Sequence, residues 1–260
     1  MKSYTQFLAS STKGAQIFLM LTSVGTCFAF YNYGISFETI ILIIFGYFLY
    51  GCLGIVVTFH RYLTHKSYET NPYIIKILSI LGCFSGTGSP MAWVAIHINH
   101  HLKSDTLEDP HSPLHKGIKI FTLDYVNELT SATKWRMRHL ITDKFQQYLH
   151  RYYFLINIIY SLLLFSIGGF YLMIFFHWAP ATLTALMSNV VNYVGHSPSF
   201  LGSSRSYNLN DRSTNNWLWA IPSWGESWHN NHHRYPKRSY LGDRWYQVDI
   251  SGLIIHMIKR

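Results

Sequence analysis

The chain has 260 residues, of which only 13% are charged and 17% are aromatic, and its formal net charge is +9. Soluble domains carry about 25% charged residues, so the composition argues against a wholly water-soluble domain and favours a chain that is partly solvated by lipid. The positive charge does not indicate a nucleic-acid partner, because no nucleic-acid-binding motif accompanies it. Lys and Arg are absent from residues 14–60 and from residues 152–204.

Each of these two apolar blocks can supply two helices of about 20 residues, the length that crosses a bilayer. Turn-forming or polar residues interrupt the blocks near residues 32–38 and residues 177–180. The turns carry no positive charge, so the positive-inside rule places them away from the cytoplasm and both termini in it. The expected membrane spans are residues 15–31, 39–59, 153–175 and 181–196.

A fifth apolar stretch covers about residues 73–96 and differs from the other four. Gly82, Gly86, Gly88 and Pro90 lie near its centre, and such residues interrupt helices. We expect this stretch to dip into the membrane or lie at its surface rather than cross. Residues 97–151 and 205–260 are polar and would form a cytoplasmic cap. The predicted fold is one all-α domain over residues 1–260, with four transmembrane helices in two hairpins and a helical cap.

Nine of the fifteen histidines form a pattern along the chain. Residues three and four apart share one face of a helix, so the HINHH and HNNHH motifs each direct three imidazoles to one place. HRYLTH follows the second predicted span, and Asn192 lies one turn before a ninth histidine at the end of the fourth. The nine are His60, His65, His97, His100, His101, His196, His229, His232 and His233.

Nine imidazoles exceed what one metal with open coordination uses, since such a site takes three or four protein ligands. The pattern therefore predicts two metals, and imidazole alone does not choose among zinc, copper, iron and nickel. The nine can meet only on one side of the membrane, which requires that residues 73–96 do not cross. Metal-bound histidines usually donate their second N–H to an acceptor. Asp105, Asp109 and Glu226 are the expected acceptors.

These motifs resemble the membrane acyl-CoA desaturases of the delta-9, or stearoyl-CoA desaturase, type. GIVVTFHRYLTHKSYET resembles the first histidine box of that family, GSPMAWVAIHINHHLKSDTLEDPHSP the second, and NYVGHSP its NxxxH element. DRSTNNWLWAIPSWGESWHNNHHRYP resembles the third box with its approach, and Ser227 stands where many members have Gly. The resemblance implies that the nine histidines bind two irons and that Asn192 contributes through a water.

The resemblance also implies an oxygen-dependent reaction that introduces a cis double bond, in that family at delta-9, into a long saturated acyl chain. The expected partners are an acyl substrate, most simply acyl-CoA, together with O2 and membrane lipid. No HPGG haem motif follows the third box, so we expect a separate electron-donor protein such as a cytochrome b5 or a ferredoxin. The active site would face the cytoplasm.

Two other interpretations stay open at this point. A related histidine-box hydroxylase or oxygenase that acts on lipid would share the metal chemistry and differ in its product. A metal transporter would place its ligands in the middle of several spans, whereas the histidines here cluster at span ends and in the cap. The other six histidines, His111, His115, His139, His150, His177 and His256, are interpreted as structural or exposed.

Overall fold

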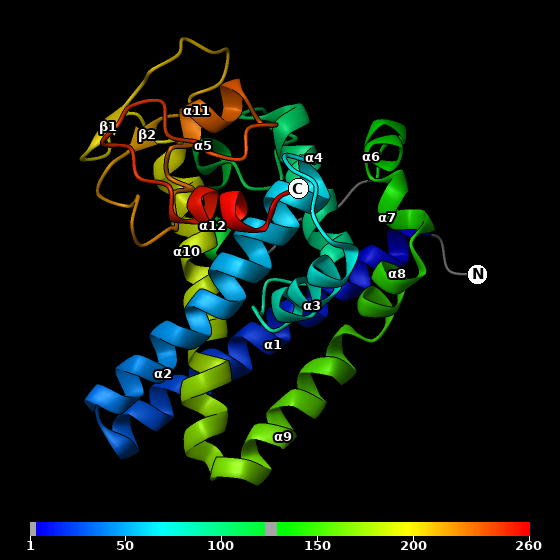
Figure 1. The fold of residues 1–260 in the computed structure, drawn as a ribbon, viewed down its shortest axis with the longest axis vertical. Coiled ribbons are helices and arrows are strands. Elements are labelled where there is room, and N and C mark those ends of the chain that lie inside the picture. Colours follow the sequence, from blue (N-terminus) through cyan, green and yellow to red (C-terminus); the bar gives the residue numbers. More distant parts are fainter. Residues whose placement is uncertain (1–3, 123–128) are drawn as a thin grey trace.

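The computed structural model describes residues 4–122 and 129–260, with side chains from residue 13 onward (Figure 1). Its elements, in chain order, are α1 (Tyr4–Tyr33), α2 (Phe37–Tyr47), the π-helix η1 (Phe48–Thr64), α3 (Pro72–Cys83), α4 (Pro90–Lys103), α5 (Pro113–Lys116), the 3-10 helix η2 (Gly117–Thr122), α6 (Ser131–Arg136), α7 (Arg138–Thr142), α8 (Lys144–Arg151), α9 (Tyr153–Met173), the π-helix η3 (Ile174–Trp178), α10 (Ala179–Gly195), β1 (Ser203–Ser204), β2 (Asn215–Asn216), α11 (His229–Arg234) and α12 (Ile250–Ile258).

The first apolar block forms a helical hairpin that turns where the sequence predicts. α1 ends at Tyr33, and α2 begins after Ser36, whose hydroxyl accepts a hydrogen bond from the Thr39 backbone N–H. The Thr39 hydroxyl in turn accepts from the Ser36 backbone N–H, so the two residues form a capping box. α2 then continues into η1 and carries the chain toward the cap.

The helix break in the second apolar block lies at a different position from the predicted one. The chain does not turn at residues 177–180, where η3 leads directly into α10. The helix is interrupted instead at Gly168 and Gly169, and Gly169 has φ +61°, a conformation that other residues adopt at a cost. The block therefore folds back at this glycine pair, at the lower end of the molecule in Figure 1. Pro180 lies at the junction of η3 and α10, where the π-helical pattern of backbone bonds passes into the α-helical one.

The stretch at residues 73–96 is not one helix. α3 has 12 residues, and a loop that contains Gly86 and Gly88, both with positive φ, separates it from α4. Ser89 caps α4, whose first residue is Pro90. At about 1.5 Å per residue, α3 is about 18 Å long, less than the roughly 30 Å hydrocarbon core. That this stretch dips into the membrane stays a prediction.

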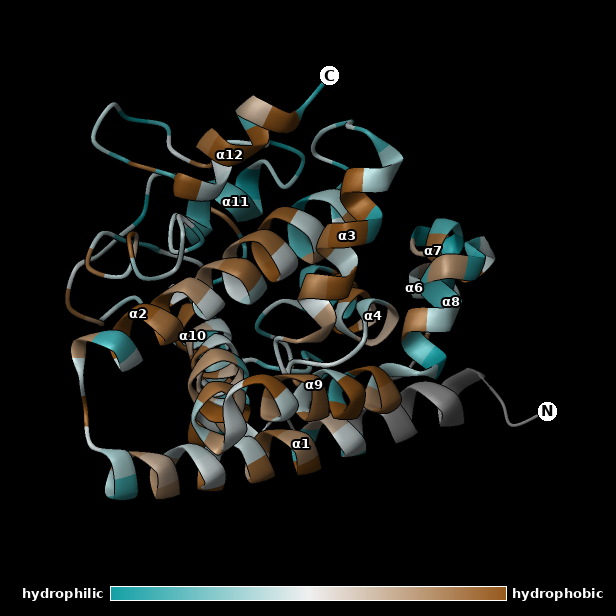
Figure 2. Ribbon diagram, turned by 60° about the horizontal axis from the view of Figure 1, so that its bottom comes forward, coloured by the Kyte–Doolittle hydropathy of each residue, from teal (hydrophilic) through white to brown (hydrophobic). Residues whose placement is uncertain are grey.

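Within the part of the chain that the structure describes, three helices are long and apolar enough to cross a membrane: Lys13–Tyr33, Phe37–Thr64 and Tyr153–Gly195. The third contains 43 residues and includes the fold at Gly168–Gly169. Large apolar side chains on these helices are exposed, for example Phe28 and Leu162, and hydrophobic colour covers much of α1 and α9 in Figure 2. Such faces are suited to lipid rather than water. The division into four spans stays a prediction.

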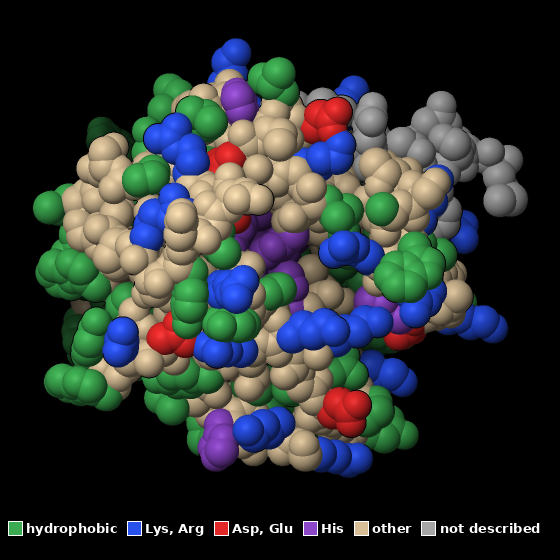
Figure 3. All heavy atoms as spheres, turned by 90° about the horizontal axis from the view of Figure 1, so that it is seen from above, with side chains coloured by type: hydrophobic (Ala, Val, Ile, Leu, Met, Phe, Trp, Pro, Cys, Tyr) green, Lys and Arg blue, Asp and Glu red, His purple; other side chains and the backbone are tan. Residues whose placement is uncertain are grey.

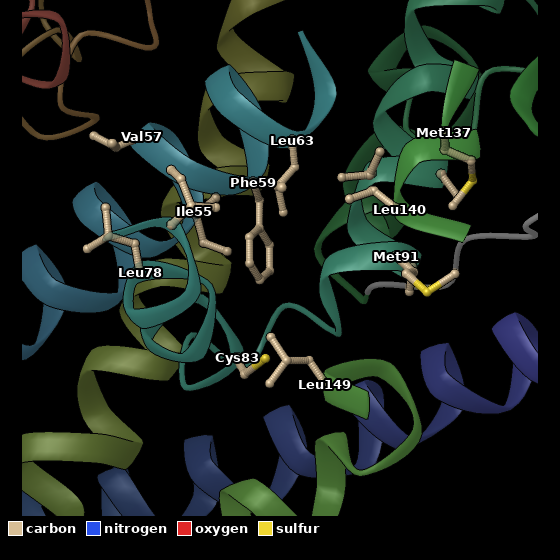
Figure 4. Packing of buried hydrophobic residues seen from close by; sticks show 14 of the residues in the cluster. Ile55, Val57, Phe59, Leu63, Leu78, Cys83, Met91, Met137, Leu140 and Leu149 are labelled. Carbon is tan, nitrogen blue, oxygen red and sulfur yellow. The ribbon is translucent and has the colours of Figure 1, made fainter. Parts of the chain in front are cut away.

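The main core lies where η1 packs against α3 and α4. Phe59 of η1 is fully buried and projects between the helices, with Met91 and Leu140 on the side toward the cap helices (Figure 4). At the crossing of η1 and α3, a Cβ on Gly54 would lie 2.5 Å from the Cα of Gly82. Backbone therefore meets backbone at this crossing, and the close approach anchors the helix that carries the first histidine motif.

The fold is mainly helical, as predicted, although the described residues also contain a short β-ladder. Ser203–Ser204 pairs antiparallel with Asn215–Asn216 to form a small two-stranded ladder in the cap. Asn215 also donates through Nδ2 to the Oδ1 atom of Asn231 at 2.7 Å. The ladder therefore attaches the segment before the third histidine motif to α11.

We expect Gly54→Ala to lower the stability of the protein by about 1–3 kcal/mol, because the added methyl group overpacks a backbone contact. The measurement is the midpoint of thermal unfolding of the purified protein in detergent. Ser166→Ala, at an exposed position of α9, is the control and should leave the midpoint unchanged. Equal midpoints for both variants would contradict this prediction, because they would mean that the crossing of η1 and α3 accommodates the added methyl group without loss of stability.

Candidate metal centre

The π-helical geometry of η1 brings the two histidines of the first motif together. In an α-helix, residues five apart point about 140° away from each other. In η1 the backbone bonds run to the fifth residue, and the His65 N–H donates to the His60 carbonyl oxygen at 3.2 Å. The two imidazole centroids are 4.8 Å apart. The spacing HxxxxH thus places both rings on one face.

The other seven histidines come from three further places in the fold. His97, His100 and His101 lie on the last turns of α4, and His229, His232 and His233 belong to α11. His196 ends α10, where its N–H donates to the Asn192 carbonyl oxygen at 3.2 Å. All nine therefore reach the cap from helix termini or short cap helices, on the same side of the molecule.

The nine rings form two groups, each with its nitrogen atoms within 4.8 Å of one another. Within the groups, neighbouring Nε2 atoms are 2.9–3.3 Å apart. Two ligand nitrogens at about 2.1 Å from one ion and at right angles would be about 3 Å apart. The five-histidine group is His60, His65, His97, His101 and His232, and the four-histidine group is His100, His196, His229 and His233.

Four of these imidazoles contact a carboxylate through Nδ1, the nitrogen that faces away from the group. A carboxylate only accepts hydrogen bonds, so these Nδ1 atoms carry the proton. The pairs are His60 with Glu226, His100 with Asp109 at 3.0 Å, His196 with Asp105 at 2.9 Å, and His233 with Asp211 at 2.8 Å.

This tautomer leaves bare lone pairs on the Nε2 atoms that face one another. His100 and His233 both use Nδ1 as a donor, yet their Nε2 atoms lie 3.3 Å apart. Two acceptors at this distance repel unless a cation lies between them. Each group consists of imidazole nitrogens alone, and three members of the four-histidine group have a lone pair oriented by a carboxylate. Such a donor set fits a transition metal.

Burial and charge support this protonation pattern. Burial, followed by the neighbouring imidazoles, lowers the pKa of His97, His101 and His229 well below the usual value. Burial alone would raise the pKa of Asp109, but the adjacent His100 outweighs it, and the pKa lies below the usual range. Near neutral pH these three imidazoles are thus neutral and Asp109 is ionised, and neutral imidazole is the form in which histidine binds metals.

Sequence reasoning named Asp105, Asp109 and Glu226 and missed Asp211. Asp211 lies 22 residues before its partner His233, so proximity along the chain does not reveal it. A local signal exists, because the Asp211 side chain accepts from the Ser213 backbone N–H at 2.9 Å. This turn fixes the carboxylate at the start of the segment that leads to the third motif.

Most of the six remaining histidines have structural partners. His139 contacts the Leu63 carbonyl oxygen at 2.8 Å, His115 the Asp105 carbonyl oxygen at 3.0 Å, and His150 the Ser89 hydroxyl. His177 contacts Ser161, and His256 is exposed. His111 differs, because its buried ring lies 4.4 Å from that of His100, centroid to centroid.

A largely apolar cavity runs from the long apolar helices to the histidines. Aliphatic and aromatic side chains such as Val56, Trp93 and Met187 line it, and His60, His97 and His229 lie on its wall. Asn192 also lines this cavity, one helical turn before His196. From the cap side, histidines are visible at the bottom of a hollow, with Lys and Arg side chains near its rim (Figure 3).

Comparison with known proteins identifies the family. The family model for fatty acid desaturase matches residues 38–248. The chain is 30% identical over 260 residues to the sn-1 stearoyl-lipid 9-desaturase of Anabaena variabilis, covering 97% of this chain and 94% of that protein. It is 32% identical over 222 residues to the acyl-CoA C20 Delta5-desaturase of Anemone leveillei, covering 82% and 68%. It is 31% identical over 219 residues to the Delta-9 acyl-lipid desaturase 2 of Arabidopsis thaliana, covering 83% and 70%.

The matched residues include all three histidine motifs and the segment that carries Asn192 and His196. Members of this family are oxidoreductases that act on fatty acyl chains, and the apolar helices and buried histidine groups fit such a protein. The chain belongs to the fatty acid desaturase family.

Proposed function

We propose that the protein introduces a cis double bond at delta-9 of a long saturated acyl chain, using O2 and two irons. The observation that carries the proposal is the pair of histidine groups at the end of an apolar cavity. The cavity is needed to bind the acyl chain, and the metals are needed to react with it. A methylene chain has no acidic or basic group on which side chains could act. A bound iron pair supplies the oxygen activation and electron transfer that C–H removal requires.

The nine histidines would hold the irons, five at one position and four at the other. Asn192 would act at the four-histidine position through a water, because its side chain lines the cavity one turn before His196. The carboxylates Asp105, Asp109, Asp211 and Glu226 would fix the tautomers of their partner imidazoles.

The cavity would select which carbons react. Burial of a methylene contributes about 0.8 kcal/mol, so apolar walls formed by residues such as Val56, Ile96 and Val191 would bind an acyl chain along its length. The two hydrogens leave adjacent carbons as O2 is reduced to two waters, and two protons from the medium complete these waters. Two of the four electrons come from the substrate and two from a separate donor protein, such as a cytochrome b5 or a ferredoxin.

The acyl carrier can be acyl-CoA or an intact lipid. Acyl-CoA is the prediction from sequence, whereas a relative matched over 97% of this chain is a stearoyl-lipid desaturase. Among the described residues, those that line the cavity include no Lys or Arg, so the cavity wall itself offers no cation for the phosphates of CoA. The apolar helices would make the protein multi-pass, with its termini and cap in the cytoplasm.

Expression in a desaturase-deficient host should produce new cis-delta-9 monounsaturated chains, detected by mass spectrometry of the fatty acids and by locating their double bonds. His100→Ala should abolish these products, because it removes one of the four imidazoles at one metal position. The exposed His256→Ala is the control and should retain them. Hydroxylated chains without alkenes would identify the protein as a hydroxylase instead.

An experiment in the same host distinguishes acyl-CoA from intact lipid as the carrier of the acyl substrate. Brief labelling with a saturated fatty acid, followed by separation of acyl-CoA from intact lipids, should show the alkene first in the pool that the enzyme uses. Appearance in lipid before acyl-CoA would refute the acyl-CoA prediction and leave the desaturase proposal intact.

Asp211→Asn should reduce iron affinity by about 10–100-fold, because the amide can turn its NH2 group toward Nδ1 of His233 and disturb the tautomer. Iron retained after dialysis against a chelator, measured by elemental analysis, tests this. Asp143→Asn, at an exposed helix cap, is the matched control. Equal iron retention in both variants would remove Asp211 from the metal centre.

A further inference from the structure

Arg61 is a buried cation immediately beside the metal centre. It follows His60 in η1, and 1% of its side chain is exposed. Its guanidinium donates through Nη2 to Glu226 Oε1 at 2.6 Å and through Nη1 to Asp249 Oδ2 at 2.7 Å. Nη1 also donates to the Ser239 carbonyl oxygen at 2.8 Å, and Nε to Glu226 Oε1 at 3.1 Å.

These contacts hold Glu226 in one orientation. Two donors of Arg61 engage Oε1 of Glu226, while Oε2 faces Nδ1 of His60. The planar guanidinium fork is suited to fixing a carboxylate in this way. A chain of contacts therefore runs from Arg61 through Glu226 to His60, whose Nε2 lies 3.1 Å from Nε2 of His232 in the five-histidine group.

The three carboxylates of the four-histidine group are held differently. Asp109 accepts from the Asp105 backbone N–H at 2.9 Å, Asp105 from the Arg212 backbone N–H at 2.7 Å, and Asp211 from the Ser213 backbone N–H at 2.9 Å. Short loops of the main chain thus orient these aspartates. Glu226 has a longer side chain with one more rotatable bond, and a charged side chain provides its anchor.

We propose that Arg61 is a positioning residue for the five-histidine metal position, acting through Glu226 on His60. This inference rests on the proposed function, because it requires that both histidine groups hold iron. Arg61 would fix Glu226 as the acceptor for the His60 N–H, and thereby direct the His60 lone pair at the metal. Loss of Arg61 would weaken retention of the iron in the five-histidine group and leave the other iron in place.

A purely structural role of Arg61 is the rival explanation. Variants of Asp249 distinguish this role from the positioning role. Asp249 caps α12 by accepting from the Gly252 N–H at 2.9 Å and also accepts from the Leu241 N–H at 2.7 Å. Arg61 could therefore serve only to attach α12 to η1. In that case, removing either partner of the Arg61–Asp249 pair would have the same effect on the whole protein.

The experiment compares Arg61→Gln, Glu226→Gln, the double variant and Asp249→Asn, each purified as the full chain and reloaded with ferrous iron. Iron per chain, the rate of iron extraction by a chelator, and the Mössbauer spectrum are measured beside the unfolding midpoint. We expect Arg61→Gln and Glu226→Gln each to release one of two irons at least about tenfold faster. The double variant should match Glu226→Gln alone, and Asp249→Asn should keep both irons despite a lower midpoint.

Arg61→Lys provides a second variant if Arg61→Gln fails to fold. The single ammonium group of lysine cannot reproduce the contacts of the planar guanidinium with Glu226. The iron in the five-histidine group should therefore again be released faster than in the unaltered protein. Unchanged extraction in the Arg61 variants, or equal iron loss in Asp249→Asn, would overturn the positioning role. Failure of the unaltered protein to bind two irons would instead overturn the proposed function.

Discussion

The site depends on one interaction, the contact between a carboxylate and the Nδ1 atom of an imidazole. This contact fixes which nitrogen of the ring carries the proton. A neutral histidine has one N–H and one lone pair, and a carboxylate on Nδ1 commits the N–H to that side. At His100, His196 and His233 the lone pair is thereby directed into the four-histidine group. The Nε2 atoms of His100 and His233, so arranged, would repel each other across 3.3 Å. A cation between them would convert this repulsion into attraction.

The rest of the fold serves to hold these rings against that repulsion. The close contact of Gly54 with Gly82 fixes η1 against α3, and the π-helical turns of η1 align His60 with His65. The ladder of β1 and β2 and the hydrogen bond from Asn215 to Asn231 fix the short α11. Rigid elements thus orient side chains that come from widely separated parts of the chain, which is what a metal site of defined geometry requires.

The two histidine groups also differ in their electrostatic surroundings. Three aspartates contact the four-histidine group, each oriented by main-chain amides. The five-histidine group has Glu226, which shares the buried Arg61 guanidinium with Asp249. Negative charge stabilises a more highly charged metal, so two positions built from the same imidazole ligand would not be chemically equivalent.

The sequence by itself determined the class of protein and the chemistry that its side chains can perform. Long uncharged blocks and motifs with i, i+3 and i+4 spacing are local properties, so they predicted apolar helices and convergent imidazoles without knowledge of the fold. The sequence predicts the break of the second block at residues 177–180, whereas the structure has it at Gly168–Gly169, because a proline and polar residues within a continuous helix resemble a loop in sequence.

Tertiary structure alone decided how the nine rings divide into groups of five and four, since His100 and His101 are neighbours in sequence yet belong to different groups. It also decided which acids reach them, because the Asp211–His233 and Arg61–Glu226 contacts join residues 22 and 165 positions apart. Such pairings depend on how helices pack against one another. Residue spacing along the chain carries no information about that packing.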